Sequence, residues 1–221
     1  RELLRTVAEA RGWTRIVADV QSLLIEKGQA VGVRLSTGEE IRAKQIVSAI
    51  GIAPTAKRLL PAAMQSEKWV QSVGKLKPAP AHVCLYLGFK GDIRAAGATA
   101  ANQWFCRSWD SGIDAWDVSP QQPIPPAPVI YCSFPSLKDP EHDPGPELLH
   151  TGEVVTFVPY EVFKPWLQRP IKHRGEDYAR FKKQLHDQLL EQFFEQRPDL
   201  KPMLAYSELS TPLSTEYFVR P

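Results

Sequence analysis

The sequence lacks several features that would each indicate a broad class of protein. Its 27 basic and 25 acidic side chains leave a formal net charge of only +2, which gives no electrostatic footprint for binding a polyanion. No apolar run is long enough to cross a bilayer. These absences argue against a nucleic-acid-binding protein and against a membrane-spanning one. We therefore expect no nucleic-acid partner.

Cysteine is also scarce. Cys84, Cys106 and Cys132 lie far apart, form no CxxC pair and have no histidine at ligand spacing. This spacing indicates neither a zinc site nor a disulfide framework, so we expect no metal and reduced thiols. The sequence carries no signal-peptide pattern, so we expect no signal peptide. We therefore expect a cytoplasmic protein, a location that is compatible with peripheral association with a membrane.

The familiar catalytic motifs are missing as well. The chain contains no GxSxG, HExxH, P-loop or GxGxxG pattern. Its five histidines are scattered singly, and the acidic pairs Glu39-Glu40 and Glu176-Asp177 are explained by a turn and a helix start. A catalytic residue therefore cannot be named from the sequence.

The first part of the chain predicts a helix followed by short strands. Apolar residues recur at helical spacing over residues 2–11, and this helix is expected to pack on a sheet. Lys27-Gly28 and Thr37-Gly38 are hairpin-turn signals, because glycine accepts a positive φ. Around these turns we expect one or two strands at residues 15–26 and single strands at 30–35 and 40–43.

Residues 45–50 differ from these strands because their side chains are uniformly apolar or small. Such a run is typical of a strand buried on both faces in a parallel sheet. Gly51 and Pro54 end it, a short helix is expected at residues 55–60, and the change in character after residue 53 suggests a domain boundary.

The rest of the chain predicts an antiparallel sheet and a long helix. Strands are expected at 81–89, 129–136, 154–160 and 205–218. The proline-rich stretch at 119–129 favours a rigid surface loop over a ligand for a proline-recognition domain. Residues 175–200 carry an apolar stripe at helical spacing, which favours a core-facing helix over a membrane-surface one. The stripe consists of Tyr178, Phe181, Leu185, Leu189 and Phe193.

Aromatic residues gather between positions 80 and 165. Five of them are compatible with an apolar pocket, although core packing would use the same residues. They are Phe89, Trp104, Phe105, Trp109 and Trp116.

Several stretches carry a collective resemblance. A helix ending in RGW, the strand RIVADV, the hairpin IEKGQAVGVRLSTGEEI and the run RAKQIVSAIG resemble the second part of the FAD-binding domain of flavin amine oxidase and phytoene desaturase-like oxidoreductases. The stretches SFPSLKDPEHDPG, RGEDYARFKKQLHDQLLEQFFEQRPDL and ELSTPLSTEYFVRP are similar to the substrate domain of the carotene isomerase and all-trans-retinol 13,14-reductase-like branch.

This resemblance implies an α/β to α+β fold. Residues 1–53 would be part of a Rossmann-like FAD-binding domain, formed by a β-meander and a parallel strand. Residues 54–211 would be a substrate domain with a mixed or antiparallel sheet and covering helices. Residues 212–221 would begin the return to the FAD-binding domain. The glycine-rich motif that opens this family's fold is absent, so we expect an internal fragment.

The resemblance implies FAD as the cofactor. Val20 would present its backbone to the adenine, and Ser48, Ala49, Ile50 and Gly51 would form a strand end of small residues that a cofactor can approach closely. The expected function is hydride exchange between flavin and a hydrophobic small-molecule substrate, such as a carotenoid-like or retinoid-like polyene. This fragment alone would be inactive. The alternative is a non-catalytic binding or interaction module that reuses the substrate-domain scaffold.

Overall fold

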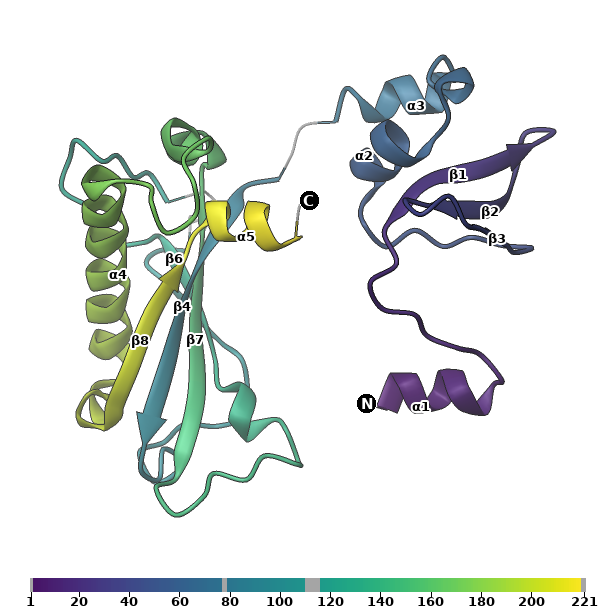
Figure 1. The fold of residues 1–221 in the computed structure, drawn as a ribbon. Coiled ribbons are helices and arrows are strands. Elements are labelled where there is room, and N and C mark those ends of the chain that lie inside the picture. The colour runs from purple at the N-terminus through teal and green to yellow at the C-terminus, as the bar shows by residue number, and fades with distance from the viewer. Residues whose placement is uncertain (1, 77–78, 110–115, 220–221) are drawn as a thin grey trace. The chain divides into compact units, whose positions relative to one another are not determined.

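The computed structural model describes residues 2–76, 79–109 and 116–219. The chain divides into two compact units, with the division at residues 78 and 79 (Figure 1). Residues 54–76 belong to the first unit, so the predicted boundary after residue 53 does not coincide with the division between the units. Within the described ranges, no helix is both long and apolar enough to span a membrane.

The first unit contains an antiparallel β-meander flanked by short helical segments. Its elements are α1 (Glu2–Glu9), β1 (Val20–Glu26), β2 (Gln29–Leu35), β3 (Glu40–Arg42), α2 (Ile52–Pro54), η1 (Thr55–Leu59), η2 (Ala62–Met64) and α3 (Lys68–Val73). Strand β2 lies between β1 and β3. Lys27, Gly28 and Gly38 have positive φ values of 50°, 77° and 87°. The predicted meander and both turns are confirmed, but the first strand begins at Val20, so the strand predicted at residues 15–19 is wrong. Ile16 and Val17 of that stretch are exposed and pair with no strand.

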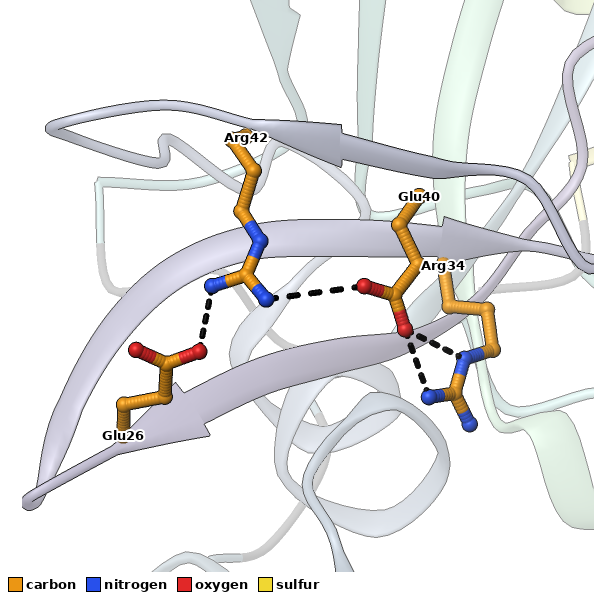
Figure 2. Close-up of polar contacts among 4 residues, drawn as sticks. All are labelled: Glu26, Arg34, Glu40 and Arg42. Atoms are coloured by element: carbon orange, nitrogen blue, oxygen red, sulfur yellow. Dashed lines mark hydrogen bonds and ion pairs between the residues drawn. The ribbon is translucent and has the colours of Figure 1, made fainter.

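A row of ion pairs crosses one face of the meander (Figure 2). Arg42 pairs with Glu26 and lies 3.6 Å from Glu40, and Arg34 Nη2 donates to Glu40 Oε1 at 2.7 Å. The hydrogen bond from Arg34 lowers the pKa of Glu40. All four side chains are exposed to solvent, so each pair contributes little to the stability of the fold. The network favours the observed strand register more than it stabilises the fold.

The predicted buried strand at residues 45–50 is wrong. These residues form no strand, and Val47 and Ile50 are 92% and 49% exposed. A strand that is apolar on both faces needs neighbours on both edges and cover on both sides. No strand among the described residues pairs with this run, so its apolar character alone cannot hold it in a sheet.

The predicted helix at residues 2–11 is confirmed as α1, but its expected packing on a sheet is not observed. Leu3, Leu4 and Val7 are 82%, 55% and 37% exposed. The helical segment after Gly51 instead forms a small apolar cluster with α3. Ala56, Val70 and Val73 are its buried members.

The second unit is built on a five-stranded antiparallel sheet with the strand order β5-β6-β7-β4-β8. The strands are β4 (Ala81–Lys90), β5 (Gln103–Cys106), β6 (Val129–Ser133), β7 (Leu149–Val158) and β8 (Leu204–Ser210). The helical elements are η3 (Pro135–Leu137), η4 (Tyr160–Trp166), α4 (Glu176–Gln196), η5 (Pro198–Met203) and α5 (Pro212–Val219). Helices combined with antiparallel sheets agree with the α+β part of the predicted fold class.

Helix α4 covers one face of this sheet (Figure 1). Phe181, Leu185, Leu189 and Phe193 of its predicted stripe are each at most 1% exposed. They pack into one core with the β4 side chains Val83, Leu85, Leu87 and Phe89, which alternate along the strand. The predicted core-facing helix is confirmed. Glu176 and Asp177 lie in its first turn, and it ends before Pro198.

The proline-rich loop is attached to α4 through a buried amide. Gln192 is 4% exposed; its Oε1 accepts from the Ala127 amide at 2.8 Å, and its Nε2 donates to the Ala127 carbonyl at 2.9 Å. Trp116 Nε1 also donates to the Pro125 carbonyl at 2.8 Å. The loop therefore runs over the protein as a fixed connector, in agreement with the surface-loop interpretation.

The predicted strand at residues 205–218 is correct only for its first half, which is β8. From Pro212 onward the chain is helical as α5. The Thr211 carbonyl accepts from the Ser214 amide at 2.8 Å, and the Tyr178 hydroxyl is 2.7 Å from Thr211 Oγ1. Proline suits the first turn of a helix because it has no N–H to satisfy and its φ is already helical. Its position after Thr211 is the signal for a helix start.

Replacing Gln192 should loosen the proline-rich loop. In Gln192→Leu the Ala127 amide and carbonyl lose their partners in the core, so we expect a loss of about 1–3 kcal/mol in the free energy of unfolding. Urea denaturation measures this loss, and hydrogen exchange at the Ala127 amide should accelerate. Gln184→Leu on the exposed side of α4 is the matched control. Equal stabilities for the two variants would contradict the assigned role of Gln192.

Candidate functional site

The segment after β3 turns sharply at Gly51, which has a φ of 96° and precedes the helical residues of α2. Thr55 holds this turn closed. Its amide and hydroxyl both donate to the Gly51 carbonyl, at 3.1 Å and 2.6 Å, and its hydroxyl also lies 2.6 Å from Ser48 Oγ. A side-chain clamp therefore fixes the conformation of residues 48–55, although no sheet supports them.

This clamped turn borders a hollow of about 400 Å³. Its lining residues are Ser48, Ala49, Gly51, Ile52, Thr55 and Trp69. Three predicted cofactor-binding residues, Ser48, Ala49 and Gly51, thus lie at one hollow. Ile50 is half exposed next to them but does not line the hollow.

Val20 is placed elsewhere in the same unit. It is half-buried at the start of β1, where it pairs with Leu35, and it does not line the hollow. Sequence reasoning missed Thr55 as the clamp and Trp69 as a wall. Trp69 comes from α3, and no short-range pattern connects it with the turn. Ser48 and Thr55, by contrast, carry hydroxyls on either side of a glycine, which is a detectable signal for a closed turn.

The second candidate surface is the sheet face opposite α4. Because side chains alternate along each strand, this face carries the other set of residues. Tyr86, Tyr206 and Trp104 are 48%, 56% and 57% exposed on it. Trp104 makes an edge contact with Tyr131, with the ring centroids 5.0 Å apart. The face is therefore an open surface rich in aromatic residues.

Two buried or hydrogen-bonded groups on this face stay protonated near neutral pH. Burial raises the pKa of the Cys84 thiol to about 11, and the neighbouring charge on Glu153 acts in the same direction. The pKa of the Tyr86 hydroxyl is also raised, first through the Cys84 side chain and then through desolvation. Neither group is poised to act as a nucleophile or base.

The predicted aromatic pocket is only partly observed. Phe89 and Trp116 are each 1% exposed in the hydrophobic core, so for these two residues the core-packing alternative is correct. The other three aromatic residues line a hollow of about 700 Å³ beside the edge strand β5. Its lining residues are Trp104, Phe105, Cys106, Arg107, Ser108, Trp109, Gln192, Glu195 and Gln196.

A further hollow, of about 340 Å³, lies where α5 meets the open sheet face. It is lined by Tyr86, Glu208, Leu209, Ser210, Ser214, Thr215, Phe218 and Val219. The Tyr206 hydroxyl donates to Glu208 Oε2 at 2.6 Å and fixes this carboxylate. Sequence analysis did not predict this hollow, because it treated residues 212–218 as strand.

Three of the five histidines lie within hydrogen-bond distance of neighbouring protein groups. Ser136 Oγ lies 3.2 Å from His150 Nδ1, and Ser207 Oγ lies 2.9 Å from His186 Nε2. His142 Nε2 lies 2.9 Å from the Leu149 carbonyl. In the described part of the chain, no group of three or more histidine, cysteine or acidic residues could hold a metal ion.

Comparison with known proteins places this arrangement in context. No protein-family profile matches the chain. Over 98% of its length it is 26% identical to an all-trans-retinol 13,14-reductase from Danio rerio, and over 96% it is 27% identical to a protein from the same organism named inactive all-trans-retinol 13,14-reductase. It is also 24% identical, over 90% of its length, to a 4,4'-diaponeurosporene oxygenase from Staphylococcus aureus strain USA300.

The chain is similar to these reductases and to this oxygenase over most of its length. The resemblance to the retinol reductase branch is thereby confirmed at modest identity over most of the chain. The chain covers 36–37% of the length of these retinol reductase and oxygenase relatives.

The three thiols of the chain should differ sharply in reactivity. Cys106 is exposed, whereas burial raises the pKa of Cys84 to about 11 and that of Cys132 to about 12. At about pH 8 only about 0.1% of Cys84 would be thiolate, the reactive form. An aromatic disulfide reagent should therefore label one thiol rapidly in the native protein. Cys106→Ser should remove the fast phase and Cys84→Ser should leave it intact. Rapid labelling of Cys84 would contradict its burial.

Proposed function

We propose that this chain is part of an FAD-dependent oxidoreductase that acts on a hydrophobic polyene, related to retinoids or carotenoids. The homology over 98% of the chain to a retinol reductase carries the proposal. The first unit would supply part of the cofactor site, and the open sheet face of the second unit would bind the substrate.

The turn at Gly51 fits a group that is recognised through the backbone. Residues 45–50 pair with no described strand, so their amides and carbonyls remain available to a ligand. Ser48 and Ala49 are small, and Gly51 carries no side chain at a φ of 96°, so a ligand can approach the main chain closely. Ser48, Ala49, Ile50 and Gly51 would therefore hold FAD, together with the backbone of Val20.

The open sheet face fits an apolar, conjugated substrate. Exposed aromatic side chains offer flat surfaces on which a polyene can pack, and their burial by a ligand would be favourable. Tyr86, Tyr206 and Trp104 are the exposed aromatic residues of this face. The chain's own contribution would be to bind and orient the polyene and to exclude water from it.

A bound flavin would supply the hydride-transfer chemistry. This division of labour agrees with the protonated state of Cys84 and Tyr86, whose raised pKa values leave them unsuited to nucleophilic or basic roles. We assign no catalytic side chain.

The alternative function is a non-catalytic binding module. A relative of equal similarity is named inactive. The two functions make different predictions for the full-length protein: the enzyme binds flavin and changes the polyene, whereas the module binds the polyene without flavin and leaves it unchanged.

The flavin site can be tested with a matched pair of glycine variants. Gly51→Ala and Gly38→Ala each place a side chain at a positive φ, 96° and 87°, and should cost a similar amount, about 1–2 kcal/mol. Only Gly51→Ala alters the proposed cofactor wall. We expect full-length protein to purify with yellow flavin absorbance, Gly51→Ala to lower the bound flavin about threefold or more, and Gly38→Ala to retain it.

Absorbance and thermal unfolding of the same samples separate lost cofactor from lost folding. Wild-type protein without flavin absorbance that takes up no added FAD would overturn the enzyme proposal. Equal flavin content in the two variants would show that residues 48–51 are not part of the flavin site.

A further inference from the structure

Strand β5 is the least protected sheet edge in the part of the chain that the structure describes. The edge strands are β1 and β3 in the first unit and β5 and β8 in the second. Charged residues occur in β1 (Glu26), β3 (Glu40 and Arg42) and β8 (Glu208), whereas β5 has none. The pairings of β1 and β8 also contain register shifts, and that of β5 is regular. Charges and bulges are the usual means by which an edge strand avoids pairing with another chain, so β5 lacks both.

The backbone of β5 directs hydrogen-bonding groups away from the sheet. The Arg107 amide, directly after the strand, donates to the Pro128 carbonyl at 3.0 Å, so this residue faces β6. Hydrogen-bonded and non-hydrogen-bonded pairs alternate along an antiparallel ladder. Phe105 therefore faces β6 as well, whereas Trp104 and Cys106 direct their amides and carbonyls to the free edge. No described strand pairs with these groups.

The side chains at this edge are exposed and the adjoining surface is neutral. Trp104 is 57% exposed although it contacts Tyr131 on one side, and Cys106 is an exposed free thiol. The hollow beside β5 is lined by one cation, Arg107, and one anion, Glu195. Neither of them forms an ion pair with another described residue. A second copy of this surface would meet it without net repulsion, whereas a strongly charged partner would gain nothing from it.

We propose that β5 pairs antiparallel with β5 of a second copy of this chain, forming a two-fold symmetric dimer. A two-fold axis perpendicular to the sheet at Phe105 places Trp104 of each copy opposite Cys106 of the other. This register gives a partner to all four outward backbone groups of each β5 strand. It also keeps the paired side chains on one face, where each indole ring packs beside a thiol of the second copy.

The same register predicts the character of the dimer. Strand β5 has only four residues, so the backbone hydrogen bonds across the joint are few and the interface is small. We therefore expect a reversible dimer whose population rises with protein concentration. The two sheets would form one continuous sheet, and the dimer does not depend on the proposed flavin or polyene sites.

Sedimentation velocity of the full-length protein over a range of concentrations tests the dimer. Trp104→Lys places a charge at the joint, so it should weaken dimerisation about tenfold or more. Tyr206→Lys is the matched control, because Tyr206 is an exposed aromatic residue on β8, the other edge of the same sheet. This control should leave the dimer unchanged. Circular dichroism of each variant establishes that it is folded.

Thiol cross-linking identifies the strand that forms the joint. From the rise and spacing of strands, the Cα atoms of the two Cys106 residues would lie about 8 Å apart. A short bis-maleimide should therefore join two wild-type chains, and Cys106→Ser should abolish this product. A protein that stays monomeric would overturn the proposal. So would a dimer that Trp104→Lys leaves intact, or one that gives no cross-link through Cys106.

Discussion

The packing of α4 against one face of the five-stranded sheet is the interaction on which the second unit depends. The buried stripe of α4 and the alternate residues of β4 fill one core, and each large apolar side chain buried there contributes about 1.5–3 kcal/mol before the cost of ordering the chain. Because the residues of a strand alternate between faces, sealing one face leaves the other set of side chains free. The stability of the unit and its candidate binding surface therefore come from the same strands.

The parts of the fold that sequence reasoning predicted correctly are governed by local rules. The meander followed from glycines at its turns, and α4 followed from a stripe that repeats every three or four residues. The errors occurred where neighbours decide the structure. Residues 45–50 have the composition of a buried strand, but no described strand pairs with them. The strand predicted at residues 205–218 was based on alternating apolar and polar side chains. Pro212, a residue typical of a helix start, already indicated that the strand ends there.

The candidate sites were predictable to a smaller extent. Resemblance, not residue chemistry, pointed to Ser48, Ala49 and Gly51, and the structure brings these three to one hollow. The position of Trp69 in the lining of this hollow could not be predicted from the sequence, because it depends on α3 folding back beside the turn at Gly51. The hollow at Glu208 was equally hidden. It requires residues 212–219 to be helical, since only then do Ser214 and Thr215 lie about one helical turn from Phe218 on the same wall.

The protonation states of the side chains on the open sheet face limit the reactions that these side chains could catalyse. Cys84 is the nucleophilic residue type on β4, but its thiol is buried and its raised pKa keeps it neutral. Tyr86 is exposed, yet its pKa is raised as well, so it can donate a hydrogen bond but does not remove a proton near neutral pH. Glu208 is engaged by Tyr206. Side chains of this kind bind and orient a ligand. A redox change in a polyene lying on them would need electrons from another source, which is the role the proposed function gives to a flavin.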